Sequence, residues 1–397
     1  MTAPQPARPL CPPLLSPQPR IAVIGGSLTG PAATLLLLAA GFDNVTCYEA
    51  TPSSAPLGGG LISLEHSALD TLEGLGISQD EIVRYPSEKI IEIRHQRGAA
   101  PQRIERLYPG RSTTWSLLHN ALTARVPVHR GRRLERLSHR GGTPVLHFTG
   151  GASTTADVIV FADGRASTGR ALLDPARRLH YAGYVGYRGR TGQPQNSQDD
   201  FLRLQPCTGV QFNIAPVPGG LDWTFYLDAT AEQYTAQFGA PPQQRLFAFG
   251  RHISTAARSH VDQHATAHLS ARHAATVHAT RTRMAVPVFD IDAPTRMVWP
   301  IGDGYAVLLG DSLAPVRPHT ARGANNGIEQ AAGLAVALRQ HTRHGADLGA
   351  ALNGWQRRFL PAAAAAVRLG PVIGSRLGLG ATSHRTAPAD QPALTAR

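Results

Sequence analysis

Hydrophobic positions near the start of the chain occur in short runs that suit a parallel sheet. Residues 21–24 (Ile-Ala-Val-Ile) form a β-branched run that ends in glycines. Residues 31–40 form an Ala- and Leu-rich helical stretch that begins with proline, where the missing N–H costs nothing. Residues 45–48 are predicted to form the next strand. Strand, glycine turn, helix and strand within about thirty residues make the βαβ unit of a parallel sheet.

Later apolar runs extend this sheet and predict a second one. Residues 158–161, followed by Ala-Asp-Gly, and residues 306–309, followed by Gly-Asp, are typical of buried parallel strands that end in polar turns. Between about residues 180 and 300, aromatic and β-branched runs predict strands of a mostly antiparallel sheet, at 181–187, 210–214 and 223–227. A helix at 327–339 is expected to return to the first domain. The fold class is therefore predicted to be α/β, with a Rossmann-like domain and a second, mostly antiparallel domain.

These elements divide the chain into two interleaved domains and two tails. The predicted segments are 20–75, 106–178 and 299–382 for the first domain, the last including C-terminal helices, and 76–105 and 179–298 for the second. Residues 1–19 are dense in proline, and residues 383–397 are small, polar and interrupted by proline. Both tails are predicted to be flexible.

Composition and charge narrow the class of protein. The 397 residues are 42% hydrophobic and 17% charged, which is enough for a sizeable core. No run of 18 or more apolar residues and no signal peptide is evident, and the three cysteines (Cys11, Cys47 and Cys207) are far apart. We therefore expect a soluble, cytoplasmic protein, a monomer or homodimer, without membrane partners.

The basic charge favours anionic small molecules over nucleic acid. Lys and Arg number 39 against 27 Asp and Glu, for a net charge of +12, and Lys89 is the single lysine. The arginines are scattered, and no helix-turn-helix, zinc-finger or RNA-recognition signature accompanies them. Attraction of a phosphate-bearing cofactor or an anionic substrate explains the surplus better than nucleic-acid binding.

The first glycine turn carries the chemistry of dinucleotide binding. It reads Gly25-Gly26-Ser27-Leu28-Thr29-Gly30, directly after a strand and before a helix, whose N-terminus attracts phosphate. Ser27 occupies the position where a glycine usually lets the backbone approach the pyrophosphate. Glu49 ends the next strand, 24 positions after Gly25, where a carboxylate accepts hydrogen bonds from an adenosine ribose. The alternative is a glycine turn that only reverses the chain.

Two further motifs do not belong to a plain NAD-binding fold: ADGRAS, and LLGDS with the RPHTARGANNGIEQA that follows it. The order GGSLTG, ADGRAS, LLGDS and RPHTARGANNGIEQA resembles the single-component FAD-dependent aromatic hydroxylases of the para-hydroxybenzoate hydroxylase type. It is more similar still to the branch that contains 2,6-dihydroxypyridine hydroxylase, which favours GGS over GxG in the first turn. The resemblance covers about residues 20–380.

This resemblance implies an enzyme with FAD as its cofactor and NADH or NADPH as a transient reductant. The implied reaction uses O2 to hydroxylate a small phenolic or pyridine-like ring through a flavin C4a-hydroperoxide. The alternative is an FAD-dependent reductase or dehydrogenase, or an epoxidase acting on a small natural-product intermediate. The segment Gly310–Ala314 supports that alternative, because many relatives have Gly-Asp-Ala-Ala-His there.

The turn and the resemblance together imply a set of cofactor-binding residues. They are Gly25, Ser27, Leu28, Thr29, Gly30, Glu49, Ala50, Gly60, Leu61, Asp163, Gly164, Gly310, Asp311, Pro318, Gly323, Ala324 and Asn325. Asp311 is expected to accept from the ribityl hydroxyls, and Asp163-Gly164 to lie near the pyrophosphate. The backbone at 323–326 is expected to direct N–H groups at the isoalloxazine edge. An ordinary strand-end Asx turn is the alternative for Asp163 and Asp311.

The substrate pocket is inferred from position. Pro318 and His319 precede the last helix, and His319 has the chemistry to take or hold a phenolic proton. The predicted substrate-binding residues on the second sheet are Tyr184, Tyr187, Arg188, Phe212 and Phe225. Core packing is the alternative for each aromatic residue and for His319, and bracing of the sheet is the alternative to anion pairing for Arg188.

Two departures from the family pattern complete the expectations. Trp115 stands where relatives frequently have a phosphate-binding arginine, so Arg111 or Arg103 is expected to supply the charge. Residues 252–278 carry six histidines, of which His260, His264 and His268 share one helix face. A solvated His-rich face is favoured over a metal site. We expect EDTA to leave activity unchanged.

Overall fold

The computed structural model describes residues 16–52, 58–83, 87–95, 98–192 and 200–380. Residues 1–15 of the predicted leader and the whole predicted tail 383–397 lie outside these ranges. Among the described helices, none combines the length and the apolar character needed to cross a bilayer.

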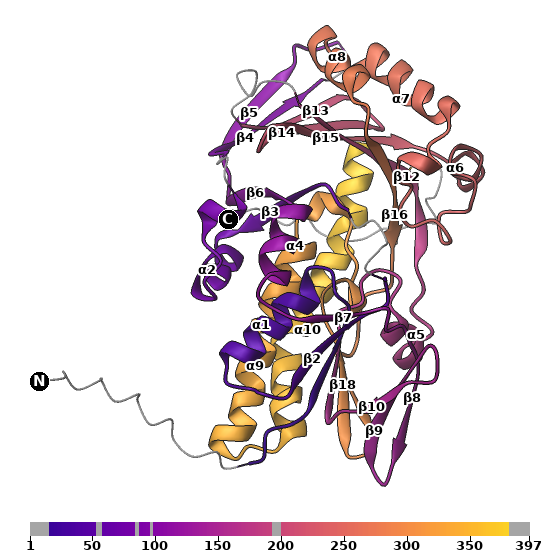
Figure 1. Cartoon of the computed structure of the whole chain (residues 1–397). Coiled ribbons are helices and arrows are strands. Elements are labelled where there is room, and N and C mark those ends of the chain that lie inside the picture. The colour runs from indigo at the N-terminus through magenta and orange to yellow at the C-terminus, as the bar shows by residue number, and fades with distance from the viewer. Residues whose placement is uncertain (1–15, 53–57, 84–86, 96–97, 193–199, 381–397) are drawn as a thin grey trace, which may run out of the picture.

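A six-stranded sheet forms the base of the molecule, with strand order β17-β18-β11-β1-β2-β7 (Figure 1). Its strands are β1 (Ile21–Ile24), β2 (Val45–Glu49), β7 (Val128–Arg130), β11 (Val158–Phe161), β17 (Val298–Ile301) and β18 (Gly304–Leu308). All neighbours are parallel except the β17–β18 hairpin. Every residue of β1 and β11 is buried, as expected for strands covered on both faces.

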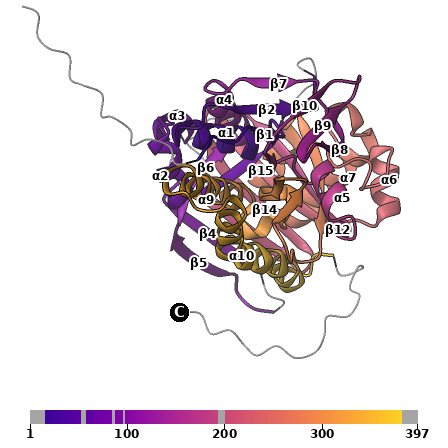
Figure 2. The same cartoon turned by 90° about the horizontal axis from the view of Figure 1, so that it is seen from below.

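Helices and a small sheet cover the two faces of this sheet (Figure 2). On one side lie α1 (Thr29–Ala39), α9 (Gly323–His344) and α10 (Leu348–Leu377). On the other side lies an antiparallel sheet of β8 (Leu134–Arg140), β9 (Thr143–Phe148) and β10 (Ser153–Thr155). Helix α5 (Thr168–Leu173) follows β11.

A seven-stranded sheet lies above the base, with order β16-β12-β15-β14-β13-β4-β5 (Figure 1). Its strands are β4 (Lys89–Arg94), β5 (Gln102–Leu107), β12 (His180–Thr191), β13 (Phe201–Cys207), β14 (Val210–Val217), β15 (Gly220–Asp228) and β16 (Arg283–Asp290). All neighbours are antiparallel except β4 and β13. The predicted second, mostly antiparallel sheet is thus confirmed.

The two faces of this upper sheet have different surroundings because successive side chains point to opposite sides. The outer face packs beneath α6 (Ala231–Phe238), α7 (Thr255–His268) and α8 (Ala271–Ala279) in one apolar core. The inner face carries Tyr184 and Tyr226. This inner face looks toward the base of the molecule.

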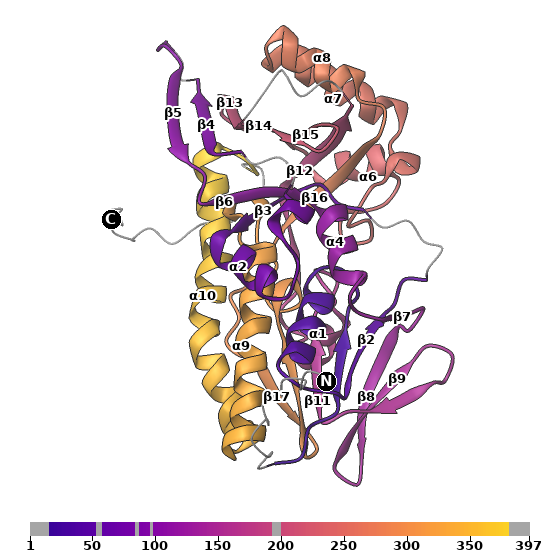
Figure 3. The ribbon, with the colours of Figure 1, turned by 60° about the vertical axis from the view of Figure 1, so that its left-hand side comes forward.

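A smaller unit joins the two sheets (Figure 3). It consists of the antiparallel pair β3 (Leu61–Glu65) and β6 (Gly110–Thr114), with α2 (His66–Gly74), α3 (Gln79–Ile82) and α4 (Trp115–Thr123). Asn325 near the start of α9 fixes this unit to the base, because its side chain accepts from Glu65 N (2.9 Å) and donates to Ser63 O (3.1 Å).

Candidate active site

The turn between β1 and α1 is built by glycines that admit no larger residue. Gly25 has φ +118°, a conformation that favours glycine, and its N–H donates to Tyr48 O at 2.8 Å. A Cβ at Gly26 would lie 2.7 Å from Glu49 Cβ, and a Cβ at Gly30 would overlap the Gly25 carbonyl oxygen. The third glycine therefore lets helix and strand pack closely, as the sequence predicts.

This turn presents free backbone donors. In the described chain, no acceptor is recorded for the N–H groups of Ser27, Leu28 and Thr29, which lie at the start of α1. Unpaired N–H groups and the helix dipole together favour an anion at this point. Glu49 accepts from Gly26 N (2.6 Å) and Thr51 N (2.7 Å), so its carboxylate is held against the turn.

A second helix N-terminus meets the first. A Cβ at Gly310 would lie 3.0 Å from Thr29 Oγ1, and a Cβ at Gly327 would meet the same hydroxyl, so α9 packs directly beside the start of α1. Across the described residues, the N–H groups of Gly323, Ala324 and Asn325 have no recorded acceptor. Ala321, just before α9, has φ +55°, an αL conformation that is strained for alanine.

Asp311 lies between these helix ends with its carboxylate unengaged by hydrogen bonds to described residues. Burial raises the pKa of Asp311, and the nearby charges of Arg165 and Arg170 oppose that rise. A Cβ at Gly323 would be 3.7 Å from Asp311 Oδ1, which places the carboxylate at the start of α9. Arg170 fixes the segment by donating to Asp311 O (3.1 Å).

The side chain of Asp163 stabilises the start of α5. Its carboxylate accepts from Ser167 Oγ (2.5 Å), Thr168 N (2.7 Å) and Gly169 N (3.2 Å), at the start of α5. These bonds reach four to six residues along the chain and hold the first turn of α5, so the side chain has a structural role, although not as the Asx turn, which would bond two residues on. Its backbone still adjoins the first turn, because a Cβ at Gly25 would lie 2.8 Å from Asp163 Cα.

Trp115 covers the first turn in place of an arginine. Its indole N–H donates to Ser27 Oγ (3.2 Å), and its ring stacks on His119 with centroids 4.3 Å apart. The expectation for Arg103 is wrong, because it lies on the edge strand β5 and pairs with Glu105 at 2.6 Å. Arg111 donates to its neighbour Gly110 O (2.8 Å).

Arg130 is the basic residue beside this turn, and sequence reasoning missed it. It ends β7 in register with Glu49 at the end of β2. Its charge also acts on His119 under the turn, contributing with burial to the lowered pKa of that imidazole. A basic residue at the carboxyl end of a third parallel strand is the signal that could have found it.

His319 lies on the inner face of the upper sheet between two tyrosines. Its Nε2 is 3.1 Å from Tyr184 Oη, and its ring centroid is 4.5 Å from that of Tyr226. Burial, with the charges of Arg203 and Arg317, lowers the pKa of His319 to about 3, so the imidazole is neutral. Pro318 beside it is exposed.

Arg188 and Asp222 connect this face to the loop before β3. A Cβ at Gly60 would lie 2.5 Å from Arg188 Nη1, so the guanidinium packs directly on that glycine. Burial raises the pKa of Asp222 to about 6, while Arg188 and the Leu61 N–H oppose the rise. Arg188 also hydrogen-bonds Tyr226, which leaves it on the His319 side of the sheet.

Three predicted substrate residues lie on the other face, and that expectation is wrong. Tyr187, Phe212 and Phe225 belong to the core beneath α7 and α8. Phe212 packs against Phe225 with centroids 5.5 Å apart. The reason is the two-residue period of a strand: Tyr184 and Arg188 share one face, and the odd-numbered Tyr187 falls on the opposite one.

Comparison with known proteins decides the family. A model described as an FAD binding domain matches residues 19–369, which is most of the chain. The chain belongs to the FAD binding domain family. It is 29% identical over 335 residues to 3-amino-4-hydroxybenzoate 2-monooxygenase of Streptomyces cremeus, covering 80% of this chain and 78% of that protein. It is 28% identical over 364 residues to 6-hydroxynicotinate 3-monooxygenase of Pseudomonas fluorescens, covering 85% and 87%.

Solved structures show the same fold for this FAD binding domain protein. Its structure is similar to that of 2,6-dihydroxypyridine-3-hydroxylase from Arthrobacter nicotinovorans, with a TM-score of 0.78 and 24% identity over 96% of this chain and 100% of the other. The predicted Rossmann-like architecture of the para-hydroxybenzoate hydroxylase type is thus confirmed. With the named relatives, the match makes the chain an FAD-dependent monooxygenase of the aromatic hydroxylase class.

The residues present fit FAD. The N-termini of α1 and α9, both with unpaired N–H groups, meet at Thr29. The first suits a pyrophosphate, and the second suits the edge of a flavin ring that becomes negative on reduction. The unengaged Asp311 carboxylate beside them is an acceptor for hydroxyl groups. The glycines at 25, 26 and 30 leave the close approach that a phosphate needs.

The histidines of α7 form a half-buried stack, which corrects the expectation of a solvated face. The rings of His260 and His264 have centroids 4.5 Å apart, and those of His264 and His268 are 5.4 Å apart. His260 Nε2 and His264 Nδ1 are buried and have no hydrogen-bond partner among the described residues. In the described part of the chain, no group of three or more His, Cys, Asp or Glu is arranged to hold a metal ion.

This stack predicts acid sensitivity. Burial lowers the pKa of His260 and His264 from 6.5, so below about pH 6.5 the unfolded chain binds more protons than the folded one. We expect the melting temperature to hold above that pH and to fall as the pH decreases toward 5. The double variant His260→Gln/His264→Gln should flatten this slope, measured by thermal melts from pH 8 to 5. If the melting temperature of the double variant falls with pH as steeply as that of the wild type, these two histidines do not cause the acid sensitivity.

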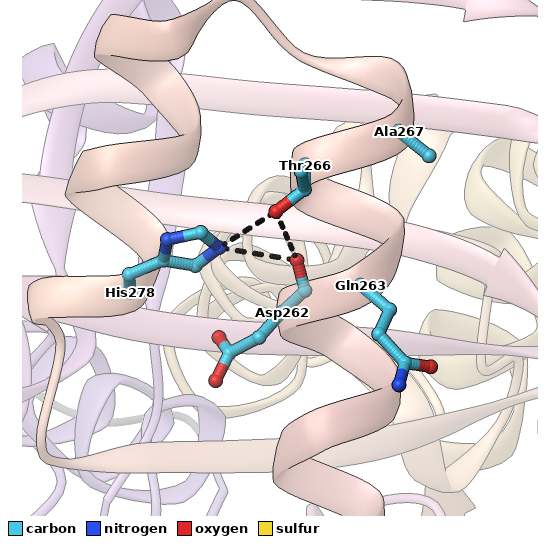
Figure 4. A pocket seen from close by; sticks show the side chains of 5 residues that line it. All are labelled: Asp262, Gln263, Thr266, Ala267 and His278. Carbon is cyan, nitrogen blue, oxygen red and sulfur yellow. Dashed lines mark hydrogen bonds between the residues drawn. The ribbon is translucent and has the colours of Figure 1, made fainter.

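A pocket of about 460 Å³ lies between α7 and α8, on the outer side of the upper sheet (Figure 4). It is lined by Asp262, Gln263, Thr266, Ala267 and His278. His278 Nε2 lies 3.1 Å from Asp262 O and 3.2 Å from Thr266 Oγ1, so the imidazole ties the two helices together. None of the predicted cofactor or substrate residues lines this pocket.

Proposed function

We propose that this FAD-dependent monooxygenase hydroxylates a small phenolic or pyridine-like ring at the inner face of the upper sheet, beside the start of α9. The observation that carries the proposal is the neutral imidazole of His319, 3.1 Å from Tyr184 Oη and directly before the helix that meets the phosphate turn. The names of the relatives support the ring class, because one acts on an aminohydroxybenzoate and another on a hydroxynicotinate.

FAD would be held by the two helix ends and the segments around them. The backbone at 27–29 would bind the pyrophosphate, Glu49 the adenosine ribose, and Asp311 the ribityl hydroxyls. The N–H groups of 323–325 would face the isoalloxazine edge. Once reduced by NADH or NADPH, bound FAD supplies electrons to O2 so that one oxygen atom can be transferred to the ring.

His319 and Tyr184 would hold the substrate hydroxyl. A ring hydroxyl would donate a hydrogen bond to the neutral imidazole, and this bond would make the aromatic ring more electron-rich and easier to hydroxylate. With its pKa lowered to about 3, His319 is too weak a base to take the proton outright, so its role would be that of a hydrogen-bond acceptor. The neutral state of His319 fits an acceptor role. Tyr184 would position the imidazole, because burial raises the pKa of its hydroxyl far above neutrality and keeps it protonated.

Arg188 would close the site on the cofactor side. Its guanidinium covers Gly60 and hydrogen-bonds Tyr226, so it would exclude water from the space beside His319. The alternative of a reductase, dehydrogenase or epoxidase rested on the altered segment at 310–314. Ser312 Oγ lies 2.5 Å from Phe161 O and 2.6 Å from Leu309 O, where its one hydrogen is shared or donated to either, and it accepts from Leu309 N (3.2 Å). Packing therefore accounts for that change and gives the alternative no specific support.

The cofactor assignment predicts that the protein carries the yellow colour of bound FAD and that substitution of Asp311 weakens FAD binding. Asp311→Asn should raise the Kd for FAD about 10- to 100-fold, since hydrogen bonds to charged groups contribute about 1.5–3 kcal/mol. The measurement is a titration of the apoprotein with FAD, followed by flavin fluorescence. Asp43→Asn, at an exposed carboxylate, is the matched control and should leave the Kd unchanged. If Asp311→Asn and Asp43→Asn have equal Kd values for FAD, Asp311 does not contribute to FAD binding.

A further inference from the structure

One buried carboxylate on the upper sheet is shared by three arginines. Glu92, whose side chain is 4% exposed, pairs with Arg94 (2.8 Å), Arg106 (2.6 Å) and Arg203 (2.7 Å). They come from β4, β5 and β13, three neighbouring strands. We call these four residues the arginine cluster.

The arginine cluster carries more positive charge than its carboxylate balances. Three guanidinium groups against one carboxylate leave an excess of two charges, and no other described acid forms an ion pair with these arginines. Burial alone would raise the pKa of Glu92, but the three arginines lower it overall, so the carboxylate stays ionised. Glu92 thus fixes the arginines without neutralising them.

The cluster retains donors for another anion. Each guanidinium has five N–H groups, and the recorded bonds to Glu92 use one from each arginine. The side chains of Arg94 and Arg106 are 48% and 50% exposed. Arg203 Nε is buried and has no hydrogen-bond partner within the part of the chain that the structure describes. Such a preorganised set of donors matches the oxygens of a carboxylate or phosphate.

The cluster lies on the same face as His319. Arg203 on β13 pairs in register with Glu92 on β4 and with Asn213 on β14. Asn213 in turn pairs with Thr224 on β15, and Thr224 pairs with Arg188 on β12. Residues paired in register share a face, so this row runs across the inner face from the edge of the sheet toward the site. Strands β4 and β5 form that edge (Figure 3).

We propose that Arg94, Arg106 and Arg203, held in place by Glu92, form an anion-binding site at the edge of the inner face. It would receive a carboxylate or phosphate group of a reactant on its way to His319. The inference rests on the proposed function for the position of the ring. Two reactants carry the required chemistry: an aromatic acid, and the pyrophosphate of NADH or NADPH.

The test compares charge-matched variants of the FAD-loaded enzyme. Arg94→Gln/Arg106→Gln removes two half-exposed charges and leaves Arg203 paired with Glu92, and Arg106→Gln is the milder second variant. The control is Arg103→Gln, which lies on β5 next to the cluster but faces the other side and pairs with Glu105. FAD content and melting temperature are recorded for each. The probes are 6-hydroxynicotinate, its neutral amide 6-hydroxynicotinamide, NADH and NADPH.

An aromatic acid as the anion predicts one pattern. The double variant should raise the Kd of 6-hydroxynicotinate, read from the flavin spectrum, at least tenfold, and leave that of the amide within twofold. The dinucleotide as the anion predicts instead that the KM values of NADH and NADPH rise at least fivefold. In either case the effect should shrink at high salt, because exposed charges are screened.

The proposal is overturned if neither the acid nor either dinucleotide responds more than twofold relative to the Arg103→Gln control. Absence of any binding by 6-hydroxynicotinate, with unchanged NADH and NADPH parameters, overturns it as well. These outcomes are distinct from failure of the proposed function, in which no aromatic compound acquires oxygen while the anion affinities still respond to the arginines.

Discussion

Gly30→Ala is expected to abolish FAD binding, with the Kd raised at least 100-fold. A Cβ at this position overlaps the carbonyl oxygen of Gly25, a backbone atom in a turn fixed by the hydrogen bond from Gly25 N to Tyr48 O. The start of α1 must therefore move away from β1, and its N–H groups leave the place where the pyrophosphate would bind. The measurement is the flavin absorbance that remains with the purified protein, with the Kd from fluorescence titration.

Gly74→Ala is the matched control for this substitution. Gly74 ends α2, and a Cβ there would meet nothing within 4 Å. It should bind FAD normally and have an equal or higher melting temperature, because alanine favours helix over glycine. Retention of stoichiometric FAD with wild-type affinity by Gly30→Ala would mean that this turn is not the cofactor site.

His319→Asn is expected to lower kcat for hydroxylation by about 10- to 100-fold, because the hydrogen bond that the imidazole accepts from the ring hydroxyl is lost as charge develops on the ring, and such a bond contributes about 1.5–3 kcal/mol. Asparagine keeps a hydrogen bond to Tyr184 within reach but lacks the imidazole nitrogen that would accept from the ring hydroxyl. FAD content should be unchanged, because the unpaired N–H groups at the start of α9 belong to the backbone. The measurement is the rate of product formation at saturating ring substrate.

Two further variants separate the hydrogen-bonding role of His319 from packing at this site. Tyr184→Phe removes the hydroxyl that contacts His319 Nε2 and should lower kcat less than His319→Asn does. His344→Asn, at the exposed C-terminal end of α9, is the control and should have no effect. If His319→Asn keeps the wild-type kcat, the histidine only packs between the tyrosines.

The periodic signals in the sequence located the main elements of the fold. The predicted strands at 21–24 and 158–161 form at those residues, and the strand predicted at 45–48 runs one residue further to Glu49. The runs at 21–24 and 158–161 are short, apolar throughout and followed by glycine within three residues, which leaves few competing arrangements. The helix predicted at 327–339 is longer in the structure, at 323–344, because its first turn contains glycine and asparagine and lacks an apolar pattern.

The faces of the upper sheet could not be predicted in the same way. Both faces are buried and both carry aromatic residues, so the sequence has no polar alternation that separates Tyr184 from Tyr187. The resemblance indicates which strands lie near the substrate, but not which residues of each strand face it. Only the packing of α7 and α8 on one side shows that Phe212 and Phe225 belong to the core.

Long-range contacts were the other missing information. Arg130, Asp222 and the arginine cluster occupy positions that gain meaning only when strands far apart in sequence come together. Glu92 is one of the two acidic residues on β4 and β5, the other being Glu105, and nothing distinguishes it until β13 brings Arg203 against it. Local spacing carries no signal for such a contact, whereas the glycine turn is encoded within six residues.

The most direct test of the central claim is the fate of oxygen during turnover. The FAD-loaded enzyme is supplied with NADH or NADPH under ¹⁸O₂ and a panel of hydroxypyridines, hydroxybenzoates and aminohydroxybenzoates, and the products are examined by mass spectrometry. We predict that at least one ring acquires a single ¹⁸O atom, with NADH or NADPH oxidation stimulated by that ring. Oxidation of NADH or NADPH with electrons passed to an acceptor and no ¹⁸O in any product would contradict the account.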